Sequence, residues 1–256
     1  ILSAESLLGR DLEVYARYDV VLNGFAAKMS AQEAASVRQM DGVKEVYPDQ
    51  IWQPDTDTSP AFLGVDGVWD STYVPGDDSP KGEGVLVGVL DTGINMDHPS
   101  FAEVGPVDGY VHINPFGDGV YKGLCASDPQ NYVCNNKLVG VYAYTNEPIR
   151  GEDSDDHGSH TASTAAGNTV TFNYFGSNVT ITGMAPHANI IAFDVCTADG
   201  CANSATVSAV QDAIANQVDV LNYSIGPTSG PGEVPYLSAT EMAFLEATDA
   251  GAITAT

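Results

Sequence analysis

A continuous apolar run stands out near residue 85. Val85–Leu90 reads Val-Leu-Val-Gly-Val-Leu without polar alternation and is bounded by turn-forming residues on both sides. A strand that is apolar on both faces is typical of a parallel sheet covered by helices on its two sides. Ile190–Val195 and Val218–Ile225 continue the pattern. These runs predict an α/β fold built on a parallel sheet.

In the C-terminal part of the chain, apolar residues recur at the spacing of a helix. Ser204–Asn216 has apolar residues every three to four positions, which predicts a helix with one buried face. Together with the strands before and after it, this helix forms a βαβ unit. A second helix is predicted over Ser238–Ala250, and Ala252–Thr256 begins another strand.

Residues 11–55 show shorter alternating segments and predict a small α+β unit. The expected order is strand, strand, helix and strand, over Val14–Val21, Phe25–Met29, Ala31–Met40 and Val43–Tyr47. The helix is the best supported of these elements, because Ser30 and Glu33 form a capping box at its start. Residues 50–84 are rich in polar residues, Pro and Gly, and are interpreted as a linker and surface segment.

Charge narrows the possible functions. The chain has 256 residues with 34 acidic and 9 basic side chains, a net charge of −25. Such a chain cannot neutralise phosphates, so nucleic-acid partners and anionic membrane surfaces are not expected. No apolar run reaches the roughly 18 residues that cross a bilayer. We interpret the charge as a solubilising surface, as in salt-adapted or extracellular proteins. Affinity for cations or cationic partners is the alternative.

Four cysteines form two local pairs. Cys125 and Cys134 are nine positions apart, and Cys196 and Cys201 are five apart. An even number in close pairs indicates two short disulfides in an oxidising compartment. Free thiols remain possible, and so does zinc, although neither spacing is the short knuckle that zinc sites favour.

One candidate for chemistry is a carboxylate at the end of a buried strand. Functional groups in open α/β sheets cluster beyond the carboxyl ends of the strands, and Asp91 directly follows Val85–Leu90. Gly93 allows a sharp turn, and Thr92 is placed to hydrogen-bond the carboxylate locally. A carboxylate that merely ends a strand is the simpler alternative.

The other candidates are two histidines. His157 and His160 precede a helix of small residues, Thr161–Asn168, which permits close packing behind an imidazole ring. Such a histidine can bury one nitrogen against a carboxylate and present the other to a cleft. A purely structural histidine, or a metal site that uses Asp155 and Asp156, remains open, although the paired Glu of the HExxH pattern is absent.

Taken together, these segments resemble the subtilisin-like serine proteases (subtilases). The matching segments follow the order of that family and cover residues 89–94, 98–101, 156–167, 183–190 and 219–226. Residues 11–55, notably Leu22–Met29, look like the second half of the family's I9-type inhibitor propeptide. The two cysteine-containing segments look most like the large plant-type branch, which also occurs in bacteria.

The resemblance implies a division of the chain. Residues 1–55 would be the C-terminal half of the propeptide, a ferredoxin-like α+β remnant without the family's first strand and helix. Residues 56–256 would be the N-terminal portion of a subtilisin-like catalytic domain, with a parallel sheet flanked by helices. It further implies a secreted endopeptidase without cofactor or metal, which acts on proteins or peptides and is inhibited intramolecularly by its propeptide.

The resemblance also assigns roles to individual residues. Asp91 matches the triad aspartate that orients the histidine, His157 matches the general base, and His160 matches a structural position. Ser224, Ile225 and Gly226 match the edge segment whose backbone pairs with an extended substrate, which is a generic way of binding peptides. The tail of the propeptide, Tyr47–Asp55, would run toward the cleft, with cleavage around Gln53–Thr58.

The chain departs from the family pattern at its catalytic serine. The Gly-Thr-Ser-Met-Ala motif of the nucleophile does not occur, and Thr228–Gly230 is not followed by the matching helix. The oxyanion-hole Asn is expected after the strand that begins at Ala252. We therefore expect a fragment, open at both ends and inactive alone. Two alternatives are a peptide-binding or inhibitor module without a nucleophile, and a metal-dependent hydrolase using His157 and His160.

Overall fold

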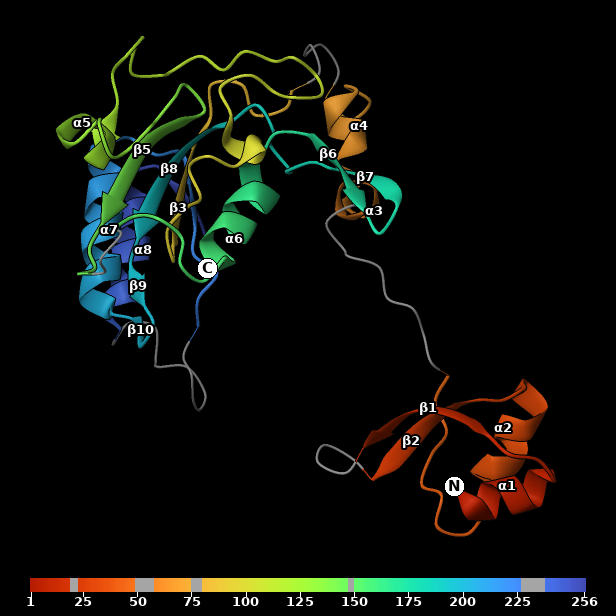
Figure 1. Cartoon of the computed structure of the whole chain (residues 1–256). Helices are drawn as coiled ribbons and strands as arrows, with labels where there is room; N and C mark the ends of the chain where they lie inside the picture. The colour runs from red at the N-terminus through yellow and green to blue at the C-terminus, as the bar shows by residue number, and fades with distance from the viewer. Residues whose placement is uncertain (19–22, 49–57, 75–79, 147–149, 227–237) are drawn as a thin grey trace. The chain divides into compact units, whose positions relative to one another are not determined.

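The computed structural model describes residues 1–18, 23–48, 58–74, 80–146, 150–226 and 238–256. The chain divides into two compact units, Ile1–Gln53 and Pro54–Thr256, each of which is described by itself (Figure 1). None of the helices in the described ranges is long and apolar enough to cross a membrane.

The larger unit is built on a six-stranded parallel sheet. Its spatial order is β12-β11-β3-β8-β5-β4. The strands are β3 (Leu86–Asp91), β4 (Lys122–Gly123), β5 (Leu138–Ala143), β8 (Asn189–Asp194), β11 (Val220–Asn222) and β12 (Ile253–Ala255). All residues of β3 and β8 are buried, as their unbroken apolar runs predicted.

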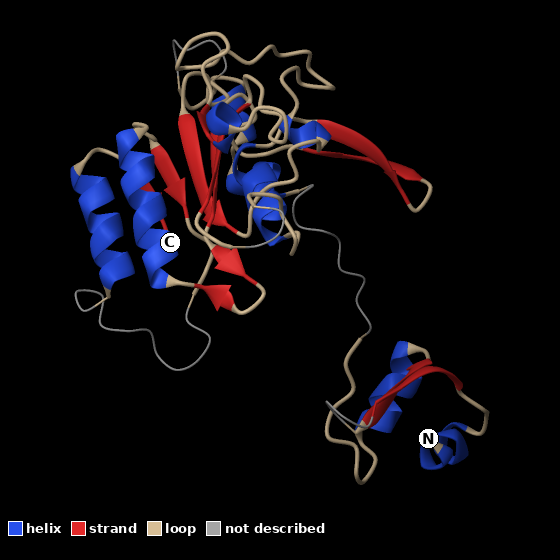
Figure 2. Cartoon of the chain, turned by 60° about the vertical axis from the view of Figure 1, so that its left-hand side comes forward, coloured by secondary structure: helices blue, strands red, loops and turns tan. Residues whose placement is uncertain are grey.

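Helices cover both faces of this sheet (Figure 2). Helices α7 (Asn203–Ala215) and α8 (Ala239–Asp249) pack on the face that receives Leu86 and Leu90. Helix α6 (His157–Ala166) packs on the opposite face, together with Val87 and Val89. Successive side chains of a strand point to opposite faces, so Asp91, at an odd position of β3, belongs to the α6 side. The predicted α/β fold is therefore confirmed.

Some element predictions need correction. Strand β11 ends at Asn222, three residues before the end of the predicted run, because its pairing with β3 and β12 stops there. Helix α6 starts at His157, a turn earlier than Thr161. Several elements were not predicted: α3 (Ser59–Leu63), α4 (Asp66–Trp69), η2 (Pro99–Phe101), β4, α5 (Leu124–Ser127), β5, the hairpin β6 (Val170–Tyr174) and β7 (Ser177–Ile181), and the short hairpin β9 (Cys196–Thr197) and β10 (Gly200–Cys201).

Among its described residues, the smaller unit has two helices and one antiparallel strand pair. The order is α1 (Leu2–Leu8), β1 (Glu13–Tyr18), β2 (Gly24–Lys28) and α2 (Ala31–Arg38). The predicted capping box is confirmed, because Ser30 accepts the amide of Glu33 and the Glu33 carboxylate accepts the amide of Ser30. This exchange fixes the start of α2.

Two expectations for the smaller unit are wrong. The segment from Val43 to Tyr47 is not a strand, because no described strand pairs with it. Val43 instead packs as a partly buried side chain against the small core. The expectation that no helix precedes β1 is also wrong: α1 is present, buries Ala4 and ends at Gly9 with a left-handed φ of 67°.

Both cysteine pairs are disulfides. Cys125 joins Cys134 with a Cα–Cα distance of 5.8 Å, and Cys196 joins Cys201 with 4.0 Å. The second bridge closes the hairpin of β9 and β10. No cysteine of the chain is free. Both pairs agree with the spacing argument, and each bridge is a local staple.

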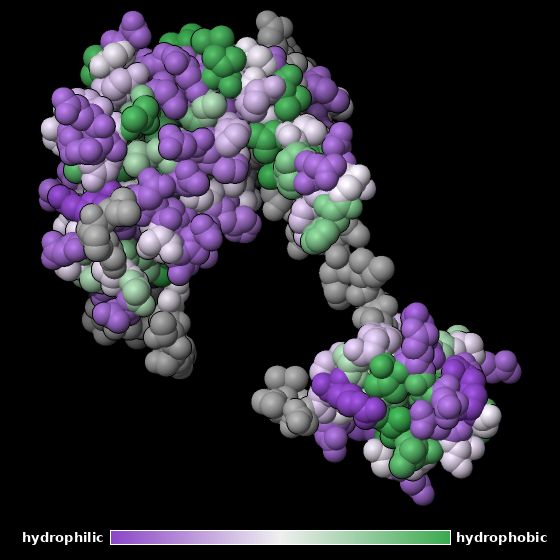
Figure 3. Space-filling model, in the orientation of Figure 1, coloured by the Kyte–Doolittle hydropathy of each residue, from purple (hydrophilic) through white to green (hydrophobic). Residues whose placement is uncertain are grey.

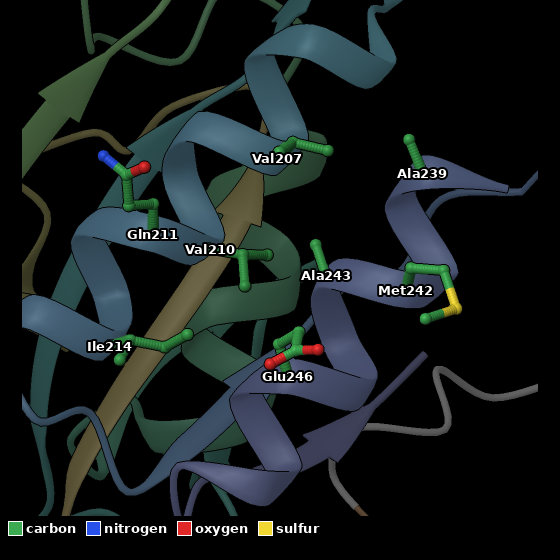
Figure 4. Close-up of a pocket in the computed structure, with 8 residues that line it drawn as sticks. All are labelled: Val207, Val210, Gln211, Ile214, Ala239, Met242, Ala243 and Glu246. Carbon is green, nitrogen blue, oxygen red and sulfur yellow. The ribbon is translucent and has the colours of Figure 1, made fainter.

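The larger unit is largely polar on the face that Figure 3 shows. Hydrophilic side chains cover much of this face, in line with a charge that resides on the surface. One apolar groove runs between α7 and α8 and is lined by Val207, Val210, Gln211, Ile214, Ala239, Met242, Ala243 and Glu246 (Figure 4). The groove lies on the helix layer that covers the face opposite α6.

A buried lysine links two chain segments at the amino-terminal end of the sheet's strands. Lys137 is 0% exposed, and its Nζ donates to the carbonyl oxygens of Pro186 at 2.8 Å and Ala188 at 2.6 Å. It thereby links the start of β5 to the segment that enters β8. Burial lowers the pKa of Lys137 from 10.5 to about 7, because removal from water disfavours the charged ammonium.

This shift predicts a pH-dependent stability. Between about pH 7 and 10 the unfolded chain holds a proton on Lys137 that the folded chain has released. The free energy of unfolding should therefore rise with pH over that window, by at most about 1.4 kcal/mol per pH unit from this group. Chemical unfolding at pH 7, 8 and 9 should show this slope reduced in Lys137→Met. Equal slopes in the two proteins would contradict the assignment.

Candidate active site

The candidate site forms where the end of β3 meets the start of α6, two elements that lie side by side (Figure 1). β3 delivers Asp91 as its last residue, and α6 begins with His157. The sequence separates these residues by 66 positions. The parallel sheet brings them together, because its carboxyl edge is where the connections to the covering helices start and end.

The two side chains are hydrogen-bonded. Nδ1 of His157 lies 2.7 Å from Oδ1 of Asp91. The Asp91 side chain is 1% exposed, whereas that of His157 is 44% exposed. Oδ1 also accepts the amide of Thr92 at 2.8 Å, and Oδ2 accepts the hydroxyl of Thr161 at 3.2 Å. A buried, fixed carboxylate thus holds one side of an imidazole whose remainder is open to solvent.

This pairing changes the basicity of the imidazole. The hydrogen bond to Asp91 raises the pKa of His157 above its usual value, against the smaller lowering effect of burial. The charges of Asp91, Asp155 and Asp153 raise the pKa further. A raised pKa means that the site stabilises the protonated imidazolium, which is what a general base needs once it has taken a proton.

The expectation that a local hydrogen bond joins the Asp91 carboxylate to Thr92 is confirmed, and it is made by the backbone of Thr92. Its backbone amide bonds the carboxylate of Asp91, but its hydroxyl does not. The hydroxyl donates to Oδ1 of Asp153 at 2.7 Å and accepts the amide of Gly158 at 2.8 Å. Thr92 therefore ties the turn after β3 to the first turn of α6, instead of holding Asp91 through its side chain.

Asp153 was missed by the sequence analysis. Its carboxylate accepts the amides of Ser159 at 2.6 Å, Asp156 at 3.0 Å and Asp155 at 3.2 Å, in addition to the Thr92 hydroxyl. An anion at a helix N-terminus satisfies free amides and interacts favourably with the helix dipole. Asp153 precedes the true start of α6 by four residues. The helix was predicted to start a turn later, which concealed this capping position.

Two glycines allow the elements to approach closely. A Cβ on Gly158 would lie 2.2 Å from the carbonyl oxygen of Gly93, which is closer than any real contact. Gly93 has a φ of 104°, and a Cβ there would lie 2.7 Å from the carbonyl oxygen of Glu152. A side chain at Gly158 would push α6 away from the turn after β3, and one at Gly93 would push away the loop that leads into α6. The glycines in both motifs are therefore required by the distance between Asp91 and His157.

His160, the second candidate histidine, is not part of the pair formed by Asp91 and His157. His160 is exposed on α6. Within the ranges that the structure describes, no group of three or more His, Cys, Asp or Glu side chains is arranged to hold a metal ion. His157 uses Nδ1 for Asp91, so the site is organised as a carboxylate–imidazole pair.

The segment expected to bind substrate follows β11. Ser224, Ile225 and Gly226 form no strand, and within the described residues none of their backbone groups has a hydrogen-bond partner. Asn222, the last residue of β11, donates from its side chain to the Ser224 hydroxyl at 3.1 Å. Thr228–Gly230 and most of the expected cleavage region, Gln53–Thr58, lie outside the described residues.

Comparison with known proteins identifies related sequences. The family described as subtilase family matches residues 82–254, and peptidase inhibitor I9 matches residues 6–55. Subtilisin-like proteases SBT4.13 and SBT4.12 of Arabidopsis thaliana are each 39% identical over 225 residues, 86% of this chain and 28% of each relative. SBT4.10 of the same plant is 37% identical over 217 residues, 82% of this chain and 28% of the relative. The chain thus spans less than a third of the length of these relatives.

The pairing predicts a measurable titration. The hydrogen bond to Asp91 is the contact that raises the pKa of His157 most. Asp91→Asn replaces the carboxylate by a neutral amide, so the pKa of His157 should fall. Asp155→Asn is the matched control, because Asp155 raises the same pKa more weakly and does not touch the ring. NMR titration of the imidazole signals in both variants of this chain measures the difference. An equal shift in both variants would contradict the geometry.

Proposed function

Because the chain belongs to the subtilase family, we propose that it is part of a secreted serine endopeptidase in which Asp91 and His157 are two members of an Asp-His-Ser triad. The observation that carries this proposal is the hydrogen bond of 2.7 Å between the buried Asp91 and the half-exposed His157. A carboxylate behind an imidazole fixes the tautomer and stabilises the imidazolium. The exposed ring nitrogen can then take the proton of a serine hydroxyl.

The proposed nucleophile lies outside these 256 residues. The family's Gly-Thr-Ser-Met-Ala motif does not occur in them, and the relatives are more than three times longer than the matched part. We assign the serine and the oxyanion-hole Asn to residues that follow Thr256 in a longer polypeptide. Loss of the serine from such a triad lowers the rate by about 10⁶, so this chain alone should be inactive.

The proposed substrates are proteins and peptides in extended conformation. Ser224, Ile225 and Gly226 support this through backbone groups that have no partner among the described residues. An extended peptide can bind such groups as an added strand. Main-chain hydrogen bonds are made by every residue type, so this part of the site does not select a side chain.

The two units have different proposed roles. Residues 1–55 are assigned as inhibitor propeptide, in line with the I9 match to residues 6–55, and residues 56–256 as the N-terminal portion of the catalytic domain. Secretion is supported by the two disulfides, since these persist in oxidising compartments. The alternative is a module without a nucleophile that binds peptides or inhibits a protease.

Activity of the longer polypeptide tests the proposal. The protein encoded through the next stop codon should hydrolyse an unfolded protein substrate and react with a fluorophosphonate at one serine. His157→Ala should lower kcat by about 10⁶ and Asp91→Ala by about 10⁴. A polypeptide that ends without a nucleophile motif, or one that shows neither hydrolysis nor labelling, would favour the binding module.

Inhibition by the smaller unit tests the propeptide assignment. Added to the mature protease, the intact propeptide that contains residues 1–55 should inhibit it. Deletion of residues 47–55 from this propeptide should raise the inhibition constant at least about 10-fold, because several main-chain hydrogen bonds of about 0.5–1.5 kcal/mol each would be lost. Gln32→Ala, an exposed position on α2, is the control and should inhibit like the parent. Unchanged inhibition after the deletion would leave the segment as a folding aid only.

A further inference from the structure

The two oxygens of the Asp91 carboxylate are held in different ways. Oδ1 accepts two hydrogen bonds, from Nδ1 of His157 at 2.7 Å and from the Thr92 amide at 2.8 Å. Oδ2 accepts the hydroxyl of Thr161 at 3.2 Å, the one bond to this oxygen recorded within the described ranges. Asp91 is 1% exposed, so a buried carboxylate oxygen depends on a single side chain.

Thr161 is placed for this role by the helix. It stands four residues after His157 on α6, and positions i and i+4 of a helix lie on the same face. One helix face therefore presents both the imidazole and the hydroxyl to Asp91. Any movement of α6 relative to β3 would change both contacts together.

The Thr161 hydroxyl has a second acceptor within reach. The carbonyl oxygen of Gly158 lies at 3.1 Å, on the preceding turn of α6. A hydroxyl carries one proton, and a carboxylate is a stronger acceptor than a neutral carbonyl. Donation to Gly158 would also leave an oxygen lone pair facing the buried carboxylate. The Thr161 hydroxyl therefore donates its hydrogen bond to the Asp91 carboxylate.

We propose that Thr161 is a positioning residue that holds Oδ2 of Asp91, so that Oδ1 stays aimed at Nδ1 of His157. A carboxylate that accepts on both oxygens cannot rotate about its Cβ–Cγ bond without losing a hydrogen bond. Groups of this kind keep the reacting side chains in productive geometry. This proposal rests on the proposed roles of Asp91 and His157, and Thr161 acts through Asp91.

Three variants of the longer, active polypeptide test the proposal. Thr161→Val keeps the shape and removes the hydroxyl, and kcat should fall about 10-fold with KM unchanged, the equivalent of one hydrogen bond to a charged group. Thr161→Ser restores the hydroxyl and should restore kcat. Ser163→Ala is the matched control. Its hydroxyl donates at 3.0 Å to the carbonyl oxygen of His160, three residues earlier, and does not bond Asp91. The equivalent carbonyl for Thr161 is that of Gly158.

The outcomes separate this proposal from the proposed function. An inactive wild-type polypeptide would overturn the proposed function. An active one in which Thr161→Val matches wild type, or in which Thr161→Ser fails as Thr161→Val does, would overturn the role of Thr161. Thermal unfolding of each variant shows whether the fold is intact.

A spectroscopic measurement on the 256-residue chain tests the positioning without any activity. The Nδ1 proton of His157 should give a low-field NMR signal while it is bonded to Asp91. Thr161→Val should broaden this signal through faster exchange with water, and Thr161→Ser should restore it. A signal equally sharp in wild type and Thr161→Val would overturn the proposal.

Discussion

The close approach of the turn after β3 to the first turn of α6 is the constraint on which the site depends. Gly158 has no room for a Cβ against the carbonyl of Gly93. At this contact the Thr92 hydroxyl bridges the Gly158 amide and the Asp153 carboxylate. The pair of Asp91 and His157 is therefore a consequence of how a strand end and a helix start fit together, because neither residue can move without its element.

The sheet fixes the other half of that geometry. Asp91 lies at the end of a strand that is buried along its whole length between α6 and the layer of α7 and α8. Its register with β8 places it beside Asp194, whose carboxylate accepts the amide of Gly151 at 3.0 Å. The Gly151 carbonyl in turn accepts the amide of Ile94 at 3.0 Å. The loop before α6 is thus attached to two neighbouring strands.

Two basic side chains link loops inside the larger unit. Lys137 is fully buried and donates to the backbone before β8. His187 lies between the carboxylates of Glu83 and Asp108 and stacks on Tyr110 with ring centroids 3.7 Å apart. Both groups join loops at the amino-terminal end of the strands, away from Asp91. The acidic surplus is left on the surface, where water solvates it at little cost.

The sequence by itself determined the features that depend on local patterning. Unbroken apolar runs identified β3 and β8, because strands buried on both faces cannot alternate. The capping box at Ser30 identified α2, and the motifs around Asp91 and His157 identified the candidate pair. Local patterning fails where a partner far along the chain decides the outcome. Val43 has strand propensity, but a strand exists only where another strand pairs with it, and none of the described strands does.

Only the tertiary structure decided the contacts that hold the site. Asp153 caps α6 and binds Thr92 across 61 positions, and Thr161 reaches Asp91 across 70. No spacing rule links such positions, since their distance is set by the packing of α6 on the sheet. The Thr92 hydroxyl illustrates the same limit. The local bond of Thr92 to Asp91 is made by its backbone amide, whereas its hydroxyl bonds the Asp153 carboxylate and the Gly158 amide, which only the packing of α6 brings within reach.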